Sequence, residues 1–487
     1  MAARLTGRWT QGVRLGLFLL VALVTRCAVF GDWNYQVDDQ FYALVGEQMR
    51  HGARLYVDIW DRKGPLLYAL YAALAWLAPG VLAWQLAALL AVVAGALGIA
   101  AMGTALADAR AGTLAGLAWC LLVLPLGGSN GQSEVFYEPL VIACAALLIA
   151  DRGELRRGRL TWRLLGGFLC ARLAIAMKQA AAIETGALGL IALAVQAHGR
   201  VAPARALANG VALALMAALP LLAVAATYAA AGHFAALWQA LVTSNLARGY
   251  MPAAERWHRL PTVLALLALP LGFAALGAAA LARRGDREAL LIVLGWAIAA
   301  GGAILVFPNI VNHYLLTALP PLCVLATGVY RRGALGLAAL AGLALTVMPA
   351  SAALRWQDRA ASRRESAALV AYARAVTPDR RLLVWGFPSY LYVLLDAPPP
   401  RPLAFPPHLF DAGENRAAGR DQASETRRIL ATRPQTVIVQ QPLPVSPLNL
   451  ESTALVSAYV ARCRARRPFM LRDEFGPERQ IVYSGCG

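Results

Sequence analysis

Long apolar segments separated by short polar connections dominate the first 353 residues. Many approach the roughly 20 residues that an α-helix needs to cross a bilayer. This pattern predicts an all-α polytopic membrane protein with 11 to 13 transmembrane helices. The apolar segments lie at 15–31, 66–80, 82–105, 112–126, 137–150, 164–178, 179–196, 206–231, 260–281, 289–306, 315–330 and 333–353.

Basic connections predict the orientation, because cytoplasmic loops are enriched in Lys and Arg. The basic N-terminus precedes an apolar segment without a small-residue cleavage site, which favours a retained first span and a cytoplasmic N-terminus. The other basic connections are 151–163, 198–205, 282–288 and 331–332. The opposite, extracytoplasmic side then receives residues 32–65, 127–136, 232–259 and 308–314 and the tail after 353.

One inconsistency remains in this topology. An odd number of spans must separate an outer loop at 32–65 from an inner one at 151–163, yet four apolar segments lie between them. One of these must therefore be re-entrant, split or fused with its neighbour. The short segments at 66–80 and 112–126 are the candidates.

The C-terminal part, 354–487, has the composition of a small extracytoplasmic α/β domain, beside a transmembrane domain at 1–353. Apolar periodicity predicts helices at 362–376 and 425–433 and strands at 380–386, 434–441 and 479–485. Cys463 and Cys486 lie in this part. In an oxidising compartment they could form a disulfide worth roughly 3 kcal/mol, or they could remain free.

Composition supports the membrane assignment. Of the 487 residues, 59% are hydrophobic and 15% are charged, whereas soluble proteins are about a quarter charged. The net charge of +18 is explained by basic cytoplasmic loops, so we expect membrane lipids as partners and no nucleic acid.

The stretch from Val37 to Pro65 is unusually acidic, with five of the 27 Asp and Glu residues: Asp38, Asp39, Glu47, Asp58 and Asp61. Apolar residues recur at helical spacing after Asp39, which predicts a short amphipathic helix at the membrane interface. Asp38 or Asp39 could simply cap this helix. Capping explains one aspartate but not the cluster, and ionisable groups beside hydrocarbon tend to mark functional sites.

Lysine usage points to the same loop. Only two lysines occur, Lys63 and Lys178, among 45 basic residues, and both fall at predicted outer edges of spans. Arginine supplies positive charge elsewhere. A compact ammonium at these two places suggests contact with a phosphate.

Other polar residues are predicted on the outer side, and together they indicate a mixed-charge cavity. In such a cavity a carboxylate can accept a proton from an attacking hydroxyl while cations stabilise a departing phosphate. Inverting glycosyl transfer from a polyprenyl-phosphate sugar fits this chemistry. The residues are Glu134, Glu138, Asn245, Arg248, Tyr250, Arg256, His258, Asn309, Asn312, His313 and Tyr314.

The acidic loop also resembles a known one. "DDQFYALVGEQMRHGARLYVDIWDRKGPLLYAL" is similar to the first outer loop of the membrane-embedded GT-C glycosyltransferases. The closest group is the bacterial branch of the dolichyl-phosphate-mannose protein mannosyltransferase family, which includes the lipid A aminoarabinose transferases. The acidic pair, Tyr42, the Gly52-to-Tyr56 spacing, Asp58 or Asp61, and Lys63 before Pro65 match that pattern. Two positions depart from the pattern. The acidic pair is Asp-Asp where Asp-Glu is commoner, and Gly64 stands where the pattern has the first proline after the lysine.

The resemblance implies that Asp38 is the catalytic base, that Lys63 binds the donor phosphate and that Glu134 is a second acid. The departure from Asp-Glu leaves the base open between Asp38 and Asp39. We therefore expect the following assignments. Donor phosphate contacts come from Lys63, Lys178, Arg248 and His313; substrate contacts come from Tyr42, Tyr56, Asp58, Asp61, Glu134 and Tyr314.

The acceptor is not specified by the sequence. We expect an extracytoplasmic glycan, lipid or protein hydroxyl, with a glycan or lipid favoured, and a bacterial plasma-membrane location. A divalent metal is possible, but no compact ligand motif is present, so none is predicted to be required. The alternatives are a transporter or flippase of lipid-linked sugars, whose charges should lie near the bilayer midplane, and a catalytically silent envelope-assembly protein.

Overall fold

The computed structural model describes residues 2–247, 252–284, 286–306, 311–445 and 447–486, with side chains from residue 11 onward. The chain forms two compact units, each assembled from three stretches of sequence. Unit 1 contains Met1–Cys27, Gln85–Val224 and Pro252–Leu354. Unit 2 contains Ala28–Trp84, Ala225–Met251 and Arg355–Gly487. The acidic loop therefore belongs to the same unit as the C-terminal part of the chain.

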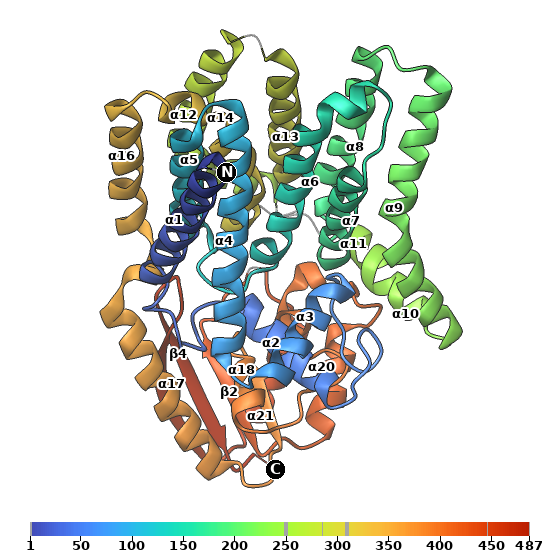
Figure 1. The fold of residues 1–487 in the computed structure, drawn as a ribbon. Coiled ribbons are helices and arrows are strands. Elements are labelled where there is room, and N and C mark those ends of the chain that lie inside the picture. The colour runs from blue at the N-terminus through green and yellow to red at the C-terminus, as the bar shows by residue number, and fades with distance from the viewer. Residues whose placement is uncertain (1, 248–251, 285, 307–310, 446, 487) are drawn as a thin grey trace. The chain divides into compact units, whose positions relative to one another are not determined.

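Unit 1 is a bundle of helices (Figure 1). Two of its helices, α4 and α9, extend at one end into the residues of unit 2. The helices are α1 (Ala2–Val24), α4 (Val81–Leu106), α5 (Ala109–Leu122), α6 (Ser133–Arg156), α7 (Trp162–Met177), α8 (Ala181–His198), α9 (Pro203–Ala230), α12 (Ala253–Ala282), α13 (Arg287–Val306), α14 (Leu319–Leu325), α15 (Thr327–Tyr330) and α16 (Ala334–Ala350), with 3₁₀ turns η1 (Leu124–Leu126), η3 (Asn312–Ala318) and η4 (Ala352–Leu354).

Eight helical stretches among the described residues are long and apolar enough to cross a bilayer, so the chain is a multi-pass membrane protein. They are Val81–Leu106, Ala109–Leu126, Ser133–Arg156, Ala181–His198, Pro203–Ala230, Ala253–Ala282, Arg287–Val306 and Asn312–Tyr330. The other predicted spans correspond to α7 and to three shorter apolar stretches, Gln11–Val24, Pro65–Leu77 and Ala334–Ala350.

The length of α3 (Pro65–Leu77) removes the inconsistency in the predicted topology. Its 13 residues extend only about 20 Å, well short of a hydrocarbon core of about 30 Å. The helix also belongs to unit 2 and packs on α2 (Val37–Arg50). Without α3, three spans separate the acidic loop from the 151–163 connection, which is the odd number required.

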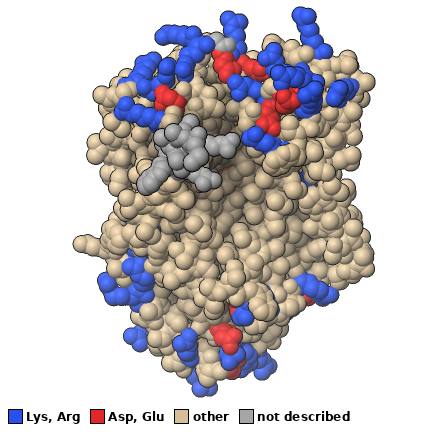
Figure 2. Space-filling view, viewed as in Figure 1, with Lys and Arg blue, Asp and Glu red and all other residues tan. Residues whose placement is uncertain are grey.

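Charged side chains are unevenly distributed over the helices of unit 1 (Figure 2). They gather at the end of the bundle where the basic connections lie, and the visible flanks of the helices carry almost none. Arg152 pairs there with Asp286, and Arg157 pairs with Glu154. Bare apolar flanks are what helices in contact with lipid require.

In unit 2 the acidic loop folds into α2 and α3, which approach each other closely at Gly46. A Cβ at this position would lie 2.7 Å from the backbone carbon of Tyr71, so a larger residue would separate the helices. The predicted helix in the loop is confirmed. Residues 39–46 of this helix are all buried, and its place at the membrane interface stays a prediction.

The C-terminal part contains a four-stranded sheet in the order β1-β2-β4-β3, with β1 parallel to β2 and the other pairs antiparallel. The strands are β1 (Leu382–Trp385), β2 (Thr436–Gln441), β3 (Ala465–Arg472) and β4 (Pro477–Ser484). The helical elements of unit 2 after the acidic loop are α10 (Phe234–Trp238), a π-helical turn η2 (Gln239–Thr243), α11 (Ser244–Ala247), α17 (Trp356–Val376), α18 (Tyr390–Leu394), α19 (Pro407–Phe410), η5 (Ala412–Glu414), α20 (Gln422–Ala431) and α21 (Leu450–Val460).

All five predicted elements of this part are confirmed: α17, β1, α20, β2 and β4. The sequence did not predict α21 or the edge strand β3. Cys463 and Cys486 form a disulfide that joins the segment after α21 to the segment after β4. Of the two states left open for these cysteines, the structure has the bonded one.

Candidate functional site

The aspartate pair opens α2. Asp38 and Asp39 are the second and third residues of the helix, and Gln36 occupies the N-cap position without capping through its side chain. Neither aspartate is therefore the cap. Both lie in the first turn, where the helix dipole favours negative charge. Asp39 is only 1% exposed, whereas Asp38 is partly exposed and is the more accessible of the two to a substrate.

Lys63 and Asp61 form the second part of the site in unit 2. The Lys63 Nζ atom lies 3.8 Å from Asp61 Oδ2 and 4.7 Å from the centre of the Tyr42 ring. The Tyr68 hydroxyl donates a hydrogen bond to the same carboxylate. His408 Nε2 lies 3.9 Å from the other oxygen of Asp61. Sequence reasoning missed Tyr68 and His408, which come from α3 and α19.

The charge state of Asp61 depends on Lys63. Burial alone would raise the pKa of Asp61, but the positive charge of Lys63 and the hydrogen bond from Tyr68 hold it below its usual value. Burial lowers the pKa of His408 to about 4, so this imidazole is uncharged at neutral pH. Lys63 is therefore the principal cation that keeps Asp61 ionised.

Three tyrosines connect the aspartate pair with Asp61. The ring of Tyr42 makes edge contacts with Tyr68 and Tyr71, at centroid distances of 5.9 and 5.5 Å. Burial and then Asp39 and Asp38 hold the pKa of Tyr71 well above its usual value. Burial and Asp61 do the same for Tyr68, with a smaller effect of Asp38. The carboxylates of α2 and of the following turn thus act on one tyrosine cluster.

Tyr56 and Asp58 shape the turn before Lys63. Tyr56 has a positive φ of 65°, and its hydroxyl donates to the backbone carbonyl of Lys63 at 2.7 Å. Asp58 instead folds back on Arg54, whose Nε atom lies 2.9 Å from Asp58 Oδ2. Hydrogen bonds from Arg54 lower the pKa of Asp58 to about 2. Of the two aspartates that could match the pattern after Tyr56, only Asp61 pairs with Lys63.

Unit 1 contains a cluster around the other lysine. Lys178 follows α7 and donates to the Glu134 carboxylate at the start of α6, and the Ser133 hydroxyl donates to the second Glu134 oxygen at 2.8 Å. The Lys178 ammonium also lies 4.6 Å from the centre of the Tyr314 ring. His313 packs edge-on against Tyr314, with ring centres 4.8 Å apart. Four predicted residues therefore meet here.

Deeper in the bundle, Glu138 and Glu184 are both almost fully buried on spanning helices. Their carboxyl groups interact, and the indole nitrogen of Trp296 donates to Glu184 at 2.8 Å. Glu138 was predicted in an outer loop, and Glu184 was not predicted. Glu138 belongs instead to α6, one turn after Glu134, and is enclosed by the bundle.

The remaining predicted residues do not join these clusters through any described contact. Asn245 and His258 are exposed, Asn312 begins η3, and Arg256 donates to the Leu305 carbonyl at 2.9 Å. Arg248, Tyr250 and Asn309 lie outside the described residues. The predicted residues that meet in the described part of the chain thus form one cluster in each unit.

A metal site finds no support in the described part of the chain. There, no three or more His, Cys, Asp or Glu side chains are grouped in a way that could hold a metal ion. Of the carboxylates described above, Asp61 and Glu134 face lysines, Asp58 pairs with Arg54, and Glu184 accepts a hydrogen bond from Trp296.

No protein-family model matches the chain, and no curated protein sequence matches it. Solved structures do. ArnT from Cupriavidus metallidurans bound to undecaprenyl phosphate matches with a TM-score of 0.56 and 16% identity, covering 96% of this chain and 97% of ArnT. The oligosaccharyltransferase AglB from Archaeoglobus fulgidus, in complex with an inhibitory peptide and a dolichol-phosphate, gives a TM-score of 0.52 and 14% identity, covering 89% of this chain and 70% of AglB.

The oligosaccharyltransferase from A. fulgidus in complex with Zn and sulfate gives a TM-score of 0.51 and 12% identity, covering 88% of this chain and 68% of that one. At these identities the likeness concerns the fold. Bundle and C-terminal sheet are both included, because nearly the whole chain aligns with ArnT. This chain therefore has the GT-C fold of ArnT and of the archaeal oligosaccharyltransferase AglB.

Proposed function

We propose that this protein is an inverting glycosyltransferase that uses a polyprenyl-phosphate sugar as donor and an extracytoplasmic hydroxyl as acceptor. The observation that carries the proposal is the arrangement in unit 2. The partly exposed Asp38 carboxylate acts electrostatically on Tyr68 and Tyr71, and the Lys63 ammonium lies 4.7 Å from the ring of Tyr42 in the same cluster. The GT-C fold supports it, since ArnT was solved with undecaprenyl phosphate and AglB with a dolichol-phosphate.

Each residue then has a chemical role. The Asp38 carboxylate accepts the proton of the acceptor hydroxyl while the hydroxyl oxygen attacks the anomeric carbon. The bond from that carbon to the phosphate oxygen breaks, and polyprenyl phosphate leaves with the electron pair. Lys63 stabilises the negative charge on the departing phosphate. One displacement inverts the anomeric centre. Asp39 is the alternative base, although its burial makes it harder to reach.

The residues of unit 1 have a supporting role in the proposal. Lys178 lies between Glu134 and the Tyr314 ring, with His313 beside that ring, and Lys178 and His313 remain phosphate contacts proposed from the sequence. Tyr42, Tyr56 and Asp61 orient Lys63. Arg248 is proposed as a further phosphate contact on the basis of the sequence alone. The disulfide supports an extracytoplasmic C-terminal part, because disulfides persist in oxidising compartments.

A transporter of lipid-linked sugars is the second candidate, and one observation favours it. Glu138 and Glu184 are ionisable groups buried on spanning helices, where such groups often mark transport pathways. A transporter would move the lipid-linked sugar without breaking its bond to phosphate.

Two measurements test the proposal. Mass spectrometry of envelope glycans from cells with and without the gene identifies the sugar and the acceptor. Purified protein in vesicles is then given that sugar on undecaprenyl phosphate, and release of undecaprenyl phosphate is measured.

Asp38→Asn should insert normally and lose transfer. Full transfer by both Asp38→Asn and Asp39→Asn would refute the assignment of the base, and translocation of intact donor without release would support the transporter.

A further inference from the structure

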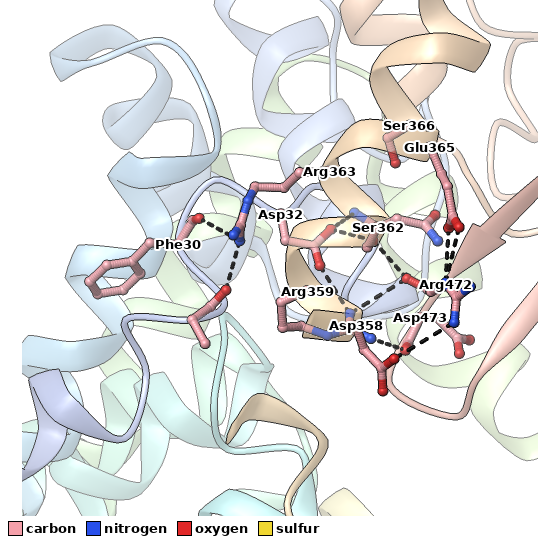
Figure 3. Close-up of polar contacts among 12 residues, drawn as sticks. Phe30, Asp32, Asp358, Arg359, Ser362, Arg363, Glu365, Ser366, Arg472 and Asp473 are labelled. Carbon is pink, nitrogen blue, oxygen red and sulfur yellow. Dashed lines mark hydrogen bonds and ion pairs between the residues drawn. The ribbon is translucent and has the colours of Figure 1, made fainter. Parts of the chain in front are cut away.

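The segment that leads into α2 is bound by α17. Asp32 lies between Arg359 and Ser362 of that helix (Figure 3), accepting from Arg359 at 2.9 Å and from Ser362 at 2.8 Å. Arg363, one residue further along, donates to the carbonyl of Ala28 at 2.7 Å and of Phe30 at 3.3 Å. Residues 28–32 are thus attached to α17 by side-chain and backbone contacts.

The same arginine and serine reach the turn between β3 and β4. Arg359 donates to the carbonyl of Asp473 at 2.6 Å, and the Ser362 hydroxyl, whose single proton can go either to Asp32 or to this acceptor, lies 2.8 Å from the carbonyl oxygen of Arg472 (Figure 3). Asp32 and Ser362 are 0% exposed and Arg359 is 2% exposed. A buried charge pair with all these hydrogen bonds fixes the mutual positions of the three segments.

The turn between β3 and β4, residues 473–476, in turn contacts the start of α2. The amide of Glu474 donates to the carbonyl of Tyr35 at 2.9 Å, and the side-chain amide of Gln36 donates to the Glu474 carboxyl at 3.0 Å. Gln36 is the N-cap residue of α2 and is fully buried. Asp38 follows two residues later, so the Glu474 contact adjoins the first turn that carries the proposed base.

The turn itself is rigidly built. The Asp473 carboxylate accepts hydrogen bonds from the amides of Phe475 at 2.7 Å and Gly476 at 2.9 Å. Gly476 has a φ of 146°, a conformation that other residues rarely adopt. These two hydrogen bonds and the backbone conformation of Gly476 define the turn that carries Glu474.

Two other carboxylates, Asp473 and Asp38, act on Glu474. Burial raises the pKa of Glu474 to about 8; Gln36 and Arg359 lower it, and Asp473 and Asp38 raise it further. Glu474 is therefore a neutral acid at pH 7. In that state it holds Gln36 without placing a second negative charge beside Asp38.

We propose that the turn between β3 and β4, acting through Glu474, is a positioning element that fixes the first turn of α2 and thereby the orientation of Asp38. This inference rests on the proposed function, in which Asp38 is the base. It gives the C-terminal sheet a role in the reaction that neither the sequence nor the comparisons assign.

The test compares three variants of the full-length protein in the vesicle assay. Glu474→Ala removes the contact with Gln36 and should lower kcat by on the order of tenfold, with little change in KM for the donor, because Lys63 is untouched. Glu474→Gln keeps an acceptor for Gln36 and cannot ionise. It should restore kcat at pH 7 relative to Glu474→Ala and keep its activity above pH 8, where we expect ionisation of Glu474 to lower the activity of the wild type.

Glu478→Gln is the matched control. Burial and Asp473 raise the pKa of Glu478 to about 8 as well, but this residue faces Asp473 and Gln440 rather than Gln36. The loss of activity of Glu478→Gln at high pH should equal that of the wild type. If Glu478→Gln and Glu474→Gln change the pH dependence of activity equally, the effect belongs to the sheet in general and the proposal is overturned. A kcat of Glu474→Ala equal to that of the wild type would overturn it as well.

Stability provides a readout that does not depend on activity. An unfolded glutamate ionises near pH 4.3, whereas folded Glu474 does so near pH 8, so the wild type should lose stability as the pH rises between these values. Glu474→Gln should lose less. An equal loss in both would refute the neutral state of Glu474. Should Asp38→Asn retain full transfer, the assignment of the base fails instead, whatever the Glu474 variants show.

Discussion

The ammonium nitrogen of Lys63 lies 3.8 Å from a carboxylate oxygen of Asp61, and both side chains are largely buried. The distance is too long for a strong hydrogen bond, and the Tyr68 hydroxyl occupies the same oxygen. Lys63 therefore neutralises Asp61 by charge while its hydrogen-bond donors remain able to contact an anion. A phosphate group is the anion that the proposed donor would bring.

Replacing Lys63 with methionine should raise KM for the polyprenyl-phosphate sugar and lower kcat. The phosphate loses a positively charged partner both in the bound donor and while it departs. The vesicle assay at several donor concentrations measures both constants. Lys63→Arg is the matched variant: the guanidinium keeps the charge but not the compact shape, so partial activity is expected. Unchanged kinetics in Lys63→Met would exclude a role at the phosphate.

A double variant separates the two functions of Lys63. If the lysine serves only to neutralise Asp61, then adding Asp61→Asn to Lys63→Met should recover both stability and activity. If the lysine binds phosphate, the double variant should recover stability alone. Thermal unfolding and the kinetic assay together distinguish these outcomes.

Arg359→Met should destabilise the protein by about 3–5 kcal/mol, because it leaves the buried Asp32 carboxylate without its cation. The Asp32→Asn/Arg359→Met double variant should be less destabilised than the sum of its single variants. Unfolding midpoints in detergent for the four proteins of this cycle measure the coupling. Strict additivity would mean that the two side chains do not interact energetically.

The sequence predicted most of the fold because its apolar segments and α/β periodicity are strong local signals. It did not predict β3, whose residues include Pro468 and several arginines, because an edge strand needs few apolar side chains and tolerates proline. Hydropathy alone did not decide whether 66–80 is a span, because the 13 residues of α3 are as apolar as those of a helix long enough to cross a bilayer.

The site was predicted only in part, for a different reason. Asp38, Lys63 and Asp61 lie within one loop, so their clustering was visible along the chain. Glu474 and His408 come from more than 340 residues further on, and their contacts with Gln36 and Asp61 arise from the fold. Charge and spacing carry no signal for such contacts. Glu184 was missed because a single acid in an apolar segment leaves the hydropathy pattern intact.

Cys463→Ser with Cys486→Ser should lower the free energy of unfolding by about 3 kcal/mol, the chain-entropy value for a separation of 23 residues. Activity at low temperature should persist, because neither cysteine contacts the aspartate pair or Lys63 by any described contact. Unfolding with and without dithiothreitol provides the measurement. The reductant should lower the unfolding midpoint of the wild type and leave that of the variant unchanged. A wild-type midpoint that does not respond to the reductant would argue against the disulfide.

Acid sensitivity should arise from His408. Its pKa is about 4 in the folded protein and about 6.5 when unfolded, so the unfolded chain takes up a proton first as the pH falls. The contribution of His408 is fully present above pH 6.5, and it decreases between about 6.5 and 4.

His408→Phe keeps the edge contacts with Trp60 and Phe405 and removes the titrating group. Unfolding midpoints at pH 7.5, 6, 5 and 4 should therefore fall more steeply for the wild type than for this variant. Parallel curves would mean that His408 takes up its proton as readily in the folded chain as in the unfolded one. His408 would then not be buried against Trp60 and beside Asp61 as the structure has it.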